Sequence, residues 1–235
     1  MKILERRDSG AVCHLHMNAP ERLNALSEEM LAALQEQIDA LHDDQSTRVV
    51  VISGAGKAFC AGHDLKQMTA GRQSEDGGKA YFKDLFDRCA KVMTGVQRLP
   101  QPVIAQVHGI ATAAGCQLVA SCDMAVAAEG TRFGVNGVNI GLFCSTPMVA
   151  LSRNIPRKKA FEMLVTGQFI DAHRAEALGL INTVVPPEDL ATATEEMAQL
   201  VASKLGAAVK IGKQAFYEQV QMELDDAYAY TGQVM

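Results

Sequence analysis

The chain has 235 residues, of which 48% are hydrophobic, 21% charged and 5% aromatic, as in a globular protein of one or two domains. Its 22 Lys and Arg against 27 Asp and Glu give a formal net charge of −5, so no basic excess favours binding to nucleic acid. No apolar segment follows the N-terminal charges, and no stretch approaches the roughly 20 apolar residues that cross a bilayer. We therefore expect a cytoplasmic protein with no membrane or nucleic-acid partner.

The first elements predicted are a hairpin and a helix. Short strands are expected over residues 2–5 and 11–17, joined by a turn at Asp8-Ser9-Gly10. A helix is predicted over residues 28–42, because apolar side chains recur there at helical spacing and Ser27 is placed to cap the first turn.

The rest of the chain alternates between strands and helices until about residue 185. Continuously apolar runs predict buried strands, and periodic runs ended by Gly or Pro predict helices. The strands are expected at 48–52, 103–107, 124–128 and 181–185; the helices are expected at 79–98, at about 115–121, within 142–164 with a break at Pro156, and at 172–178. Only helices are expected after Pro187. This order predicts an α/β core over residues 1–186 and a helical region over residues 187–235.

Cysteine and histidine spacing gives no indication of a metal site. The six cysteines include no CxxC pair and the six histidines no HExxH motif, so we expect reduced, mostly buried thiols and no bound metal. The glycine run Gly54-Ala55-Gly56 follows a predicted strand, but its spacing fits neither a dinucleotide fingerprint nor a phosphate-binding P-loop.

Two longer motifs are more informative. The segment 57–65 reads Lys-Ala-Phe-Cys-Ala-Gly-His-Asp-Leu, and the segment 102–123 runs from Pro102 through a Gly-rich turn to Asp123. Together with Pro20–Leu26 and Phe133-Gly134, they resemble the crotonase (enoyl-CoA hydratase/isomerase) superfamily over essentially the whole chain. The segments 111–118 and 141–147 resemble one branch of that family.

The resemblance implies an oxyanion hole for a CoA thioester. By position, its two donors are the backbone N–H groups of His63 and Ala114, the second near a helix N-terminus. Such donors stabilise the enolate-like oxygen that forms when a thioester reacts. No cofactor is implied beyond the CoA thioester, which is the substrate or ligand.

The resemblance also implies which residues line the CoA channel: Ala25, Ala61, Gly62, Asp64, Leu65 and Lys66. Arg22 or Lys66 would meet CoA phosphates, although either side chain could equally be an ordinary solvated charge. Asp64 is interpreted as a helix cap rather than a base, and Asp123 as structural.

Two departures from the family pattern limit the function that can be carried over. Hydratases of this family place one glutamate at the position of Gln117 and a second at the position aligned with Gly137. Adding water to an enoyl thioester requires groups that take and give protons, and an amide cannot take a proton at neutral pH. Substituting Glu at both positions is therefore expected to produce hydratase activity. His108, Cys144 and the His63 side chain are the alternative proton-transfer groups, although structural roles are favoured for all three.

The fold expected from the resemblance is the crotonase fold of repeated ββα units in a mixed sheet, with a C-terminal helical region that forms homotrimers or hexamers. Relatives carry a last helix beyond the point where this sequence stops, at Met235. Two functions remain open: an acyl-CoA enzyme of the hydratase/isomerase type with weak or absent standard hydratase activity, or an acyl-CoA-binding protein without catalysis.

Overall fold

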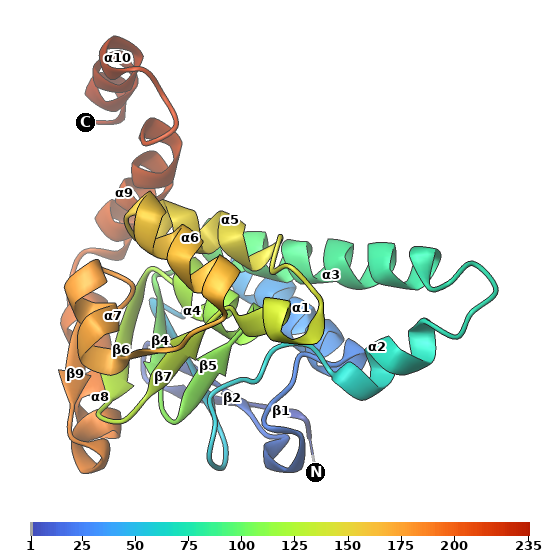
Figure 1. Ribbon diagram of the computed structural model, residues 1–235. Coiled ribbons are helices and arrows are strands. Elements are labelled where there is room, and N and C mark those ends of the chain that lie inside the picture. Colours follow the sequence, from blue (N-terminus) through green and yellow to red (C-terminus); the bar gives the residue numbers. More distant parts are fainter. Residues whose placement is uncertain (1) are drawn as a thin grey trace.

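A six-stranded sheet forms the centre of the computed structural model, which describes residues 2–235 (Figure 1). Its spatial order is β1-β2-β3-β4-β6-β9, and only the β1–β2 pair is antiparallel. The strands are β1 (Leu4–Ser9), β2 (Val12–Met17), β3 (Val49–Gly54), β4 (Val103–Val107), β6 (Met124–Ala128) and β9 (Thr183–Val185). The mixed sheet expected from the sequence is confirmed.

A second, three-stranded sheet was not predicted. It consists of β5 (Ile110–Thr112), β7 (Arg132–Gly134) and β8 (Ile170–Asp171), in the order β5-β7-β8. Strands of two or three residues are too short to show an alternating pattern, so the sequence carries no clear evidence of them. This sheet fixes β5 directly before the helix that opens the candidate site.

Helices cover both faces of the main sheet (Figure 1). They are α1 (Glu28–His42), α2 (Leu65–Gly71), α3 (Lys79–Arg98), α4 (Ala114–Ser121), α5 (Pro147–Asn154), α6 (Arg157–Thr166), α7 (Ala172–Leu178), α8 (Leu190–Ala202), α9 (Gly206–Gln219) and α10 (Leu224–Val234). Single 3-10 turns occur at Pro20–Arg22, Asn136–Ile140 and Pro187–Asp189. Within residues 2–235, no helix is both long and apolar enough to span a membrane.

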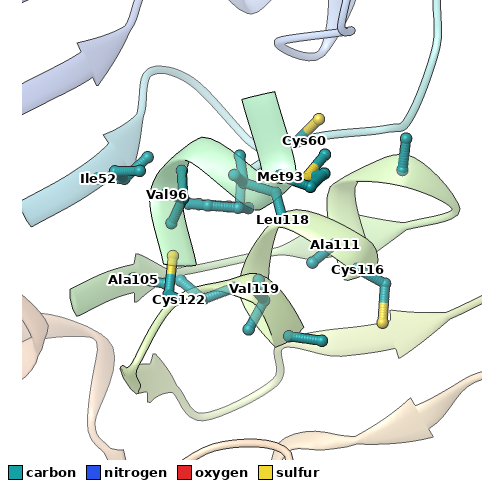
Figure 2. Packing of buried hydrophobic residues seen from close by; sticks show 14 of the residues in the cluster. Ile52, Cys60, Met93, Val96, Ala105, Ala111, Cys116, Leu118, Val119 and Cys122 are labelled. Atoms are coloured by element: carbon teal, nitrogen blue, oxygen red, sulfur yellow. The ribbon is translucent and has the colours of Figure 1, made fainter. Parts of the chain in front are cut away.

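The larger core lies between the sheet and helices α1, α3 and α4. Ile52 and Ala105 from the sheet pack there with Met93 and Val96 of α3 and with Leu118 of α4 (Figure 2). The opposite face of the sheet is covered by α8, whose Ala198 and Ala202 pack on valines and an isoleucine of β2, β3 and β4. All six cysteines are free and buried, as the sequence predicts.

Local sequence explains α1 well. The Ser27 hydroxyl accepts a hydrogen bond from the Met30 amide at 3.2 Å and so caps the helix. The buried residues Met30, Leu31, Leu34, Ile38 and Leu41 form one stripe along it. The predicted bounds of α1, α3 and α7 are confirmed.

The N-terminal hairpin differs from the prediction. Strand β1 covers residues 4–9 rather than 2–5, and the turn lies at Gly10-Ala11, because Ser9 pairs with Val12. The polar run from Glu5 to Ser9 is compatible with a strand at the edge of a sheet, where side chains are exposed. A prediction based on apolar residues therefore ends β1 too early, because its second half is polar and exposed.

The C-terminal helices α9 and α10 project away from the sheet (Figure 1). Helix α9 is held by a buried polar cluster: Lys213 Nζ lies 2.6 Å from Asp123 Oδ2 and 3.0 Å from the Gln101 carbonyl oxygen. The Tyr217 hydroxyl donates to Asp123 Oδ1 at 2.8 Å. Asp123 also accepts the Val103 amide at 2.6 Å, so its structural role is confirmed.

Removing the Lys213 charge is expected to destabilise the protein. Lys213→Met leaves the Asp123 carboxylate buried without its cation, and breaking a buried ion pair typically costs about 3–5 kcal/mol. Urea denaturation measures the loss, and Lys210→Met, on the exposed side of the same helix, is the matched control. Equal midpoints for the two variants would contradict this role.

Candidate active site

The loop of residues 59–63 lies between two other backbone segments. On one side, Ala61 N donates to Leu23 O at 3.0 Å and Leu26 N donates to Gly62 O at 2.7 Å. On the other side, Cys60 N donates to Ile110 O at 3.1 Å and Thr112 N donates to Cys60 O at 3.0 Å. Main-chain hydrogen bonds to residues 23–26 and to residues 110–112 therefore fix the loop.

Two glycines allow these segments to approach closely. A Cβ on Gly62 would lie 3.0 Å from Ala113 Cβ and 3.5 Å from Ala114 N, and the φ angle of Gly62 is +92°. A Cβ on Gly115 would lie 2.2 Å from the Cys60 carbonyl oxygen. The start of α4 therefore rests directly on the loop, which brings the His63 and Ala114 regions together.

The amides of His63 and Ala114 are both free to donate. Within residues 2–235, neither amide donates a hydrogen bond to another group. Ala114 is the first residue of α4, where backbone N–H groups have no partner inside the helix. The preceding residue, Ala113, has a φ of +49°, and such conformations cluster at functional sites in proteins.

Asp64 caps helix α2, as the sequence analysis expects. Its Oδ1 accepts hydrogen bonds from the amides of Lys66 at 2.9 Å and Gln67 at 3.2 Å. The other oxygen lies 3.6 Å from Arg22 Nη1. Arg22 is therefore placed beside the loop, and Lys66 is exposed on α2.

The remaining residues assigned to the CoA channel lie in the same region. Ala25 is buried; its amide donates to the Arg22 carbonyl oxygen and its carbonyl oxygen accepts from the Ser27 amide. Ala61 is partly exposed. The Leu65 side chain is 54% exposed although it is apolar. An exposed leucine two residues after His63 is apolar surface that a ligand could cover.

The positions of the missing glutamates differ in their surroundings. Gln117 lies one turn into α4; its side chain is buried, and within residues 2–235 its Oε1 has no hydrogen-bond partner. Gly137 has no room for a side chain, since a Cβ there would lie 2.6 Å from Leu142 O and 2.9 Å from Cys144 Sγ. A Glu at residue 137 would therefore require the backbone of the 137–144 turn to move. The expectation that Glu at both positions produces hydratase activity stays a prediction.

Two of the alternative proton-transfer groups have structural surroundings. His108 Nε2 lies 2.9 Å from the Gly56 carbonyl oxygen, which ties it to the turn after β3. Burial raises the pKa of the Cys144 thiol, so it is not an activated nucleophile. Among residues 2–235, no group of three or more His, Cys, Asp and Glu side chains is arranged to hold a metal ion.

The His63 side chain has different surroundings. Its Nδ1 lies 3.4 Å from the Leu26 carbonyl oxygen, and its ring packs edge-on against Phe86 of α3 with centroids 5.6 Å apart. Among the described residues, buried Nε2 has no partner. Burial is the main cause that lowers the pKa of this imidazole, so it is neutral at neutral pH.

Sequence reasoning missed two residues that organise this site. Asn24, fully buried with a φ of +51°, donates through Nδ2 to the carbonyl oxygens of Ala55 and Ala58, both at 2.8 Å. It thereby joins the 20–26 segment to the turn of residues 55–58, which leads into the loop. Phe86 was also missed, because nothing in a helical apolar pattern indicates which ring faces His63.

This chain has a mixed sheet with repeated strand–helix units, and Gly62 and Gly115 allow its loop of residues 59–63 to lie against α4. These features place it in the class of crotonase-fold proteins. The family described as Enoyl-CoA hydratase/isomerase matches residues 7–235, and the chain belongs to this family. It is 50% identical over 219 residues to enoyl-CoA hydratase domain-containing protein 3, mitochondrial, of Xenopus laevis, covering 93% of this chain and 73% of that protein. The human protein of the same name is 46% identical over 231 residues, with 97% and 74% covered.

The solved structures agree with the fold. An enoyl-CoA hydratase of Mycobacterium smegmatis superimposes with a TM-score of 0.95 at 54% identity, over 99% of this chain and 89% of that one. The predicted crotonase fold and the resemblance to one branch of the family are both confirmed.

The expectation of a cytoplasmic protein is contradicted by these comparisons, because the frog and human relatives are both named mitochondrial. Composition, charge and the lack of a long apolar stretch do not distinguish one aqueous compartment from another. The expectation therefore had no physical basis for choosing the cytoplasm.

Contact between Gly115 and Cys60 is predicted to hold the two amides in place. Gly115→Ala forces the Cys60 carbonyl away, and overpacking of this kind costs about 1–3 kcal/mol. The urea midpoint should fall. Gly212→Ala is the matched control, because no atom lies within 4 Å of its added Cβ and alanine favours the helix. A Gly115→Ala protein as stable as the parent would show that the contact is loose.

Proposed function

We propose that this protein binds acyl-CoA thioesters and polarises the thioester carbonyl between the backbone N–H groups of His63 and Ala114. The observation that carries the proposal is that both amides lack an acceptor among residues 2–235, on segments that Gly62 and Gly115 hold in contact. Two preorganised donors stabilise the negative oxygen of an enolate, and each contributes roughly 10²–10³ in rate. Membership in the enoyl-CoA hydratase/isomerase family supports the choice of ligand.

Standard hydration of an enoyl thioester is expected to be weak or absent. A positioned acid or base contributes about 10²–10⁴ to such a reaction, and this chain has an amide at Gln117 and no side chain at Gly137. The second candidate function, acyl-CoA binding without catalysis, is favoured by the same two positions. Thioester binding is common to both candidates.

We further propose that copies of the chain associate, as a homotrimer or hexamer. Helices α9 and α10 stand away from the sheet (Figure 1). Large apolar side chains on them are exposed, among them Phe216 at 58% and Tyr228 at 73%. Exposed apolar surface of this kind is typical of an interface. Association would cover it.

The test combines binding and turnover of crotonyl-CoA, followed by the loss of the conjugated enoyl thioester. The parent protein should bind crotonyl-CoA saturably and convert little of it. Gln117→Glu supplies one carboxylate, while Gly137 leaves no room for a second. The hydration rate should therefore rise by about 10²-fold, the lower end of what a positioned acid or base usually contributes.

Gln73→Glu, an exposed substitution of the same charge, is the control and should change neither binding nor turnover. Absence of saturable binding would overturn the proposed function. Turnover by the parent protein at the rate of an ordinary hydratase would instead overturn the role given to Gln117 and Gly137.

A further inference from the structure

A second cavity lies on the face of the main sheet opposite the larger core. Its volume is about 860 Å³, and its walls are the sheet and helix α8. Successive side chains of a strand point to opposite faces, so Ser53 and Gln106 line this cavity while Ile52 and Ala105, which precede them, pack in the larger core. Ligand sites usually have volumes of roughly 300–1,000 Å³, so the cavity is large enough for a small molecule.

Four polar side chains follow one another across adjacent strands of this cavity. Glu5 of β1 is the register partner of His16 of β2, and His16 is the register partner of Ser53 of β3. Gln106 continues the row on β4, because the residues that precede it and Ser53 are paired. All four residues line the cavity. A carboxylate, an imidazole, a hydroxyl and an amide therefore succeed one another on neighbouring strands.

The imidazole and the hydroxyl of this row are in direct contact. His16 Nδ1 lies 2.8 Å from Ser53 Oγ, and Ser53 is only 8% exposed. A buried hydroxyl proton without an acceptor is costly, and Nδ1 is the acceptor that the hydrogen bond offers, so the Ser53 proton is assigned to this bond. A serine whose proton is held by an imidazole has the arrangement of a nucleophile and its general base.

The two outer members of the row complement this pair. Glu5 is fixed by Asn18 Nδ2, which donates to its Oε1 at 2.7 Å. Its negative charge, on the strand next to His16, favours the protonated imidazole that forms when the base takes a proton. Gln106, on the opposite side of Ser53, carries two N–H donors of the kind that stabilise a carbonyl oxygen as it becomes negative.

We propose that Ser53 and His16 form a nucleophile–base pair that hydrolyses esters of short carboxylic acids in this cavity. The substrate class follows from the burial of the hydroxyl, which leaves access for a small acyl group only. The inference is independent of the proposed function, because these residues lie on the other face of the sheet from the core that includes Ala114.

The reaction balances with water as its only co-reactant. The Ser53 oxygen bonds to the ester carbonyl carbon while its proton moves to His16 Nδ1. The bond between that carbon and the alcohol oxygen then breaks, and the alcohol leaves with the proton. Water next gives a proton to Nδ1 and attacks the acyl-serine, the bond to the Ser53 oxygen breaks, and Ser53 takes the proton back as the carboxylic acid leaves.

Hydrolysis of p-nitrophenyl acetate tests the inference, with acid-quenched protein digested and analysed by mass spectrometry. The parent protein should release p-nitrophenolate and carry an acetyl group on Ser53. His16→Gln should lower both rates at least about 100-fold, because an amide cannot take the proton that a general base takes. Ser53→Ala should lower hydrolysis at least as much. Ser9→Ala, at an exposed serine of the same cavity, is the control and should react like the parent.

The position of the acetyl group is measured on the parent protein itself, so the test does not depend on the stability of any variant. An acetyl group on Ser53 that His16→Gln no longer acquires would support the pair. Acetylation confined to other residues would overturn it. Equal hydrolysis by Ser53→Ala and Ser9→Ala would overturn it as well.

Discussion

The candidate site depends on the backbone pairing of residues 59–63 with the 110–112 segment. In this pairing Cys60 N donates to Ile110 O and Thr112 N donates to Cys60 O, and helix α4 starts two residues after Thr112. The contact is so close that a Cβ at Gly115 would lie 2.2 Å from the Cys60 carbonyl oxygen. This contact between main chains holds the start of α4 against the loop of residues 59–63.

The electrostatics of the site are those of dipoles rather than charges. Asp64, the carboxylate next to His63 in sequence, is turned to the amides of α2 and to Arg22. Gln117 is an amide and Gly137 has no side chain, so neither position adds a negative charge.

Much of this arrangement was predictable from local patterns. Helix α1 and helix α3 have strong periodicity and clear boundaries, and the two long motifs of 57–65 and 102–123 located the loop and the start of α4. The oxyanion assignment of His63 and Ala114 came from resemblance, and it stays a prediction.

Three features could not be predicted because they depend on distant contacts. The strands β5, β7 and β8 are held by pairing with one another rather than by any pattern of their own. The exclusion of a side chain at Gly137 is due to the carbonyl of Leu142, which only the folded turn brings near. The environment of the His63 ring depends on Phe86, 23 positions later in the chain, and no spacing rule links the two.

The central claim is that the amides of His63 and Ala114 polarise a thioester carbonyl, and vibrational spectroscopy measures this directly. Isotope-edited infrared difference spectra of butyryl-CoA labelled with ¹³C at the carbonyl would be recorded free and bound to the protein. The account predicts that the carbonyl stretch moves to lower frequency on binding, because two hydrogen bonds weaken the C=O bond. A bound thioester that keeps the frequency of the free ligand in water would contradict the account.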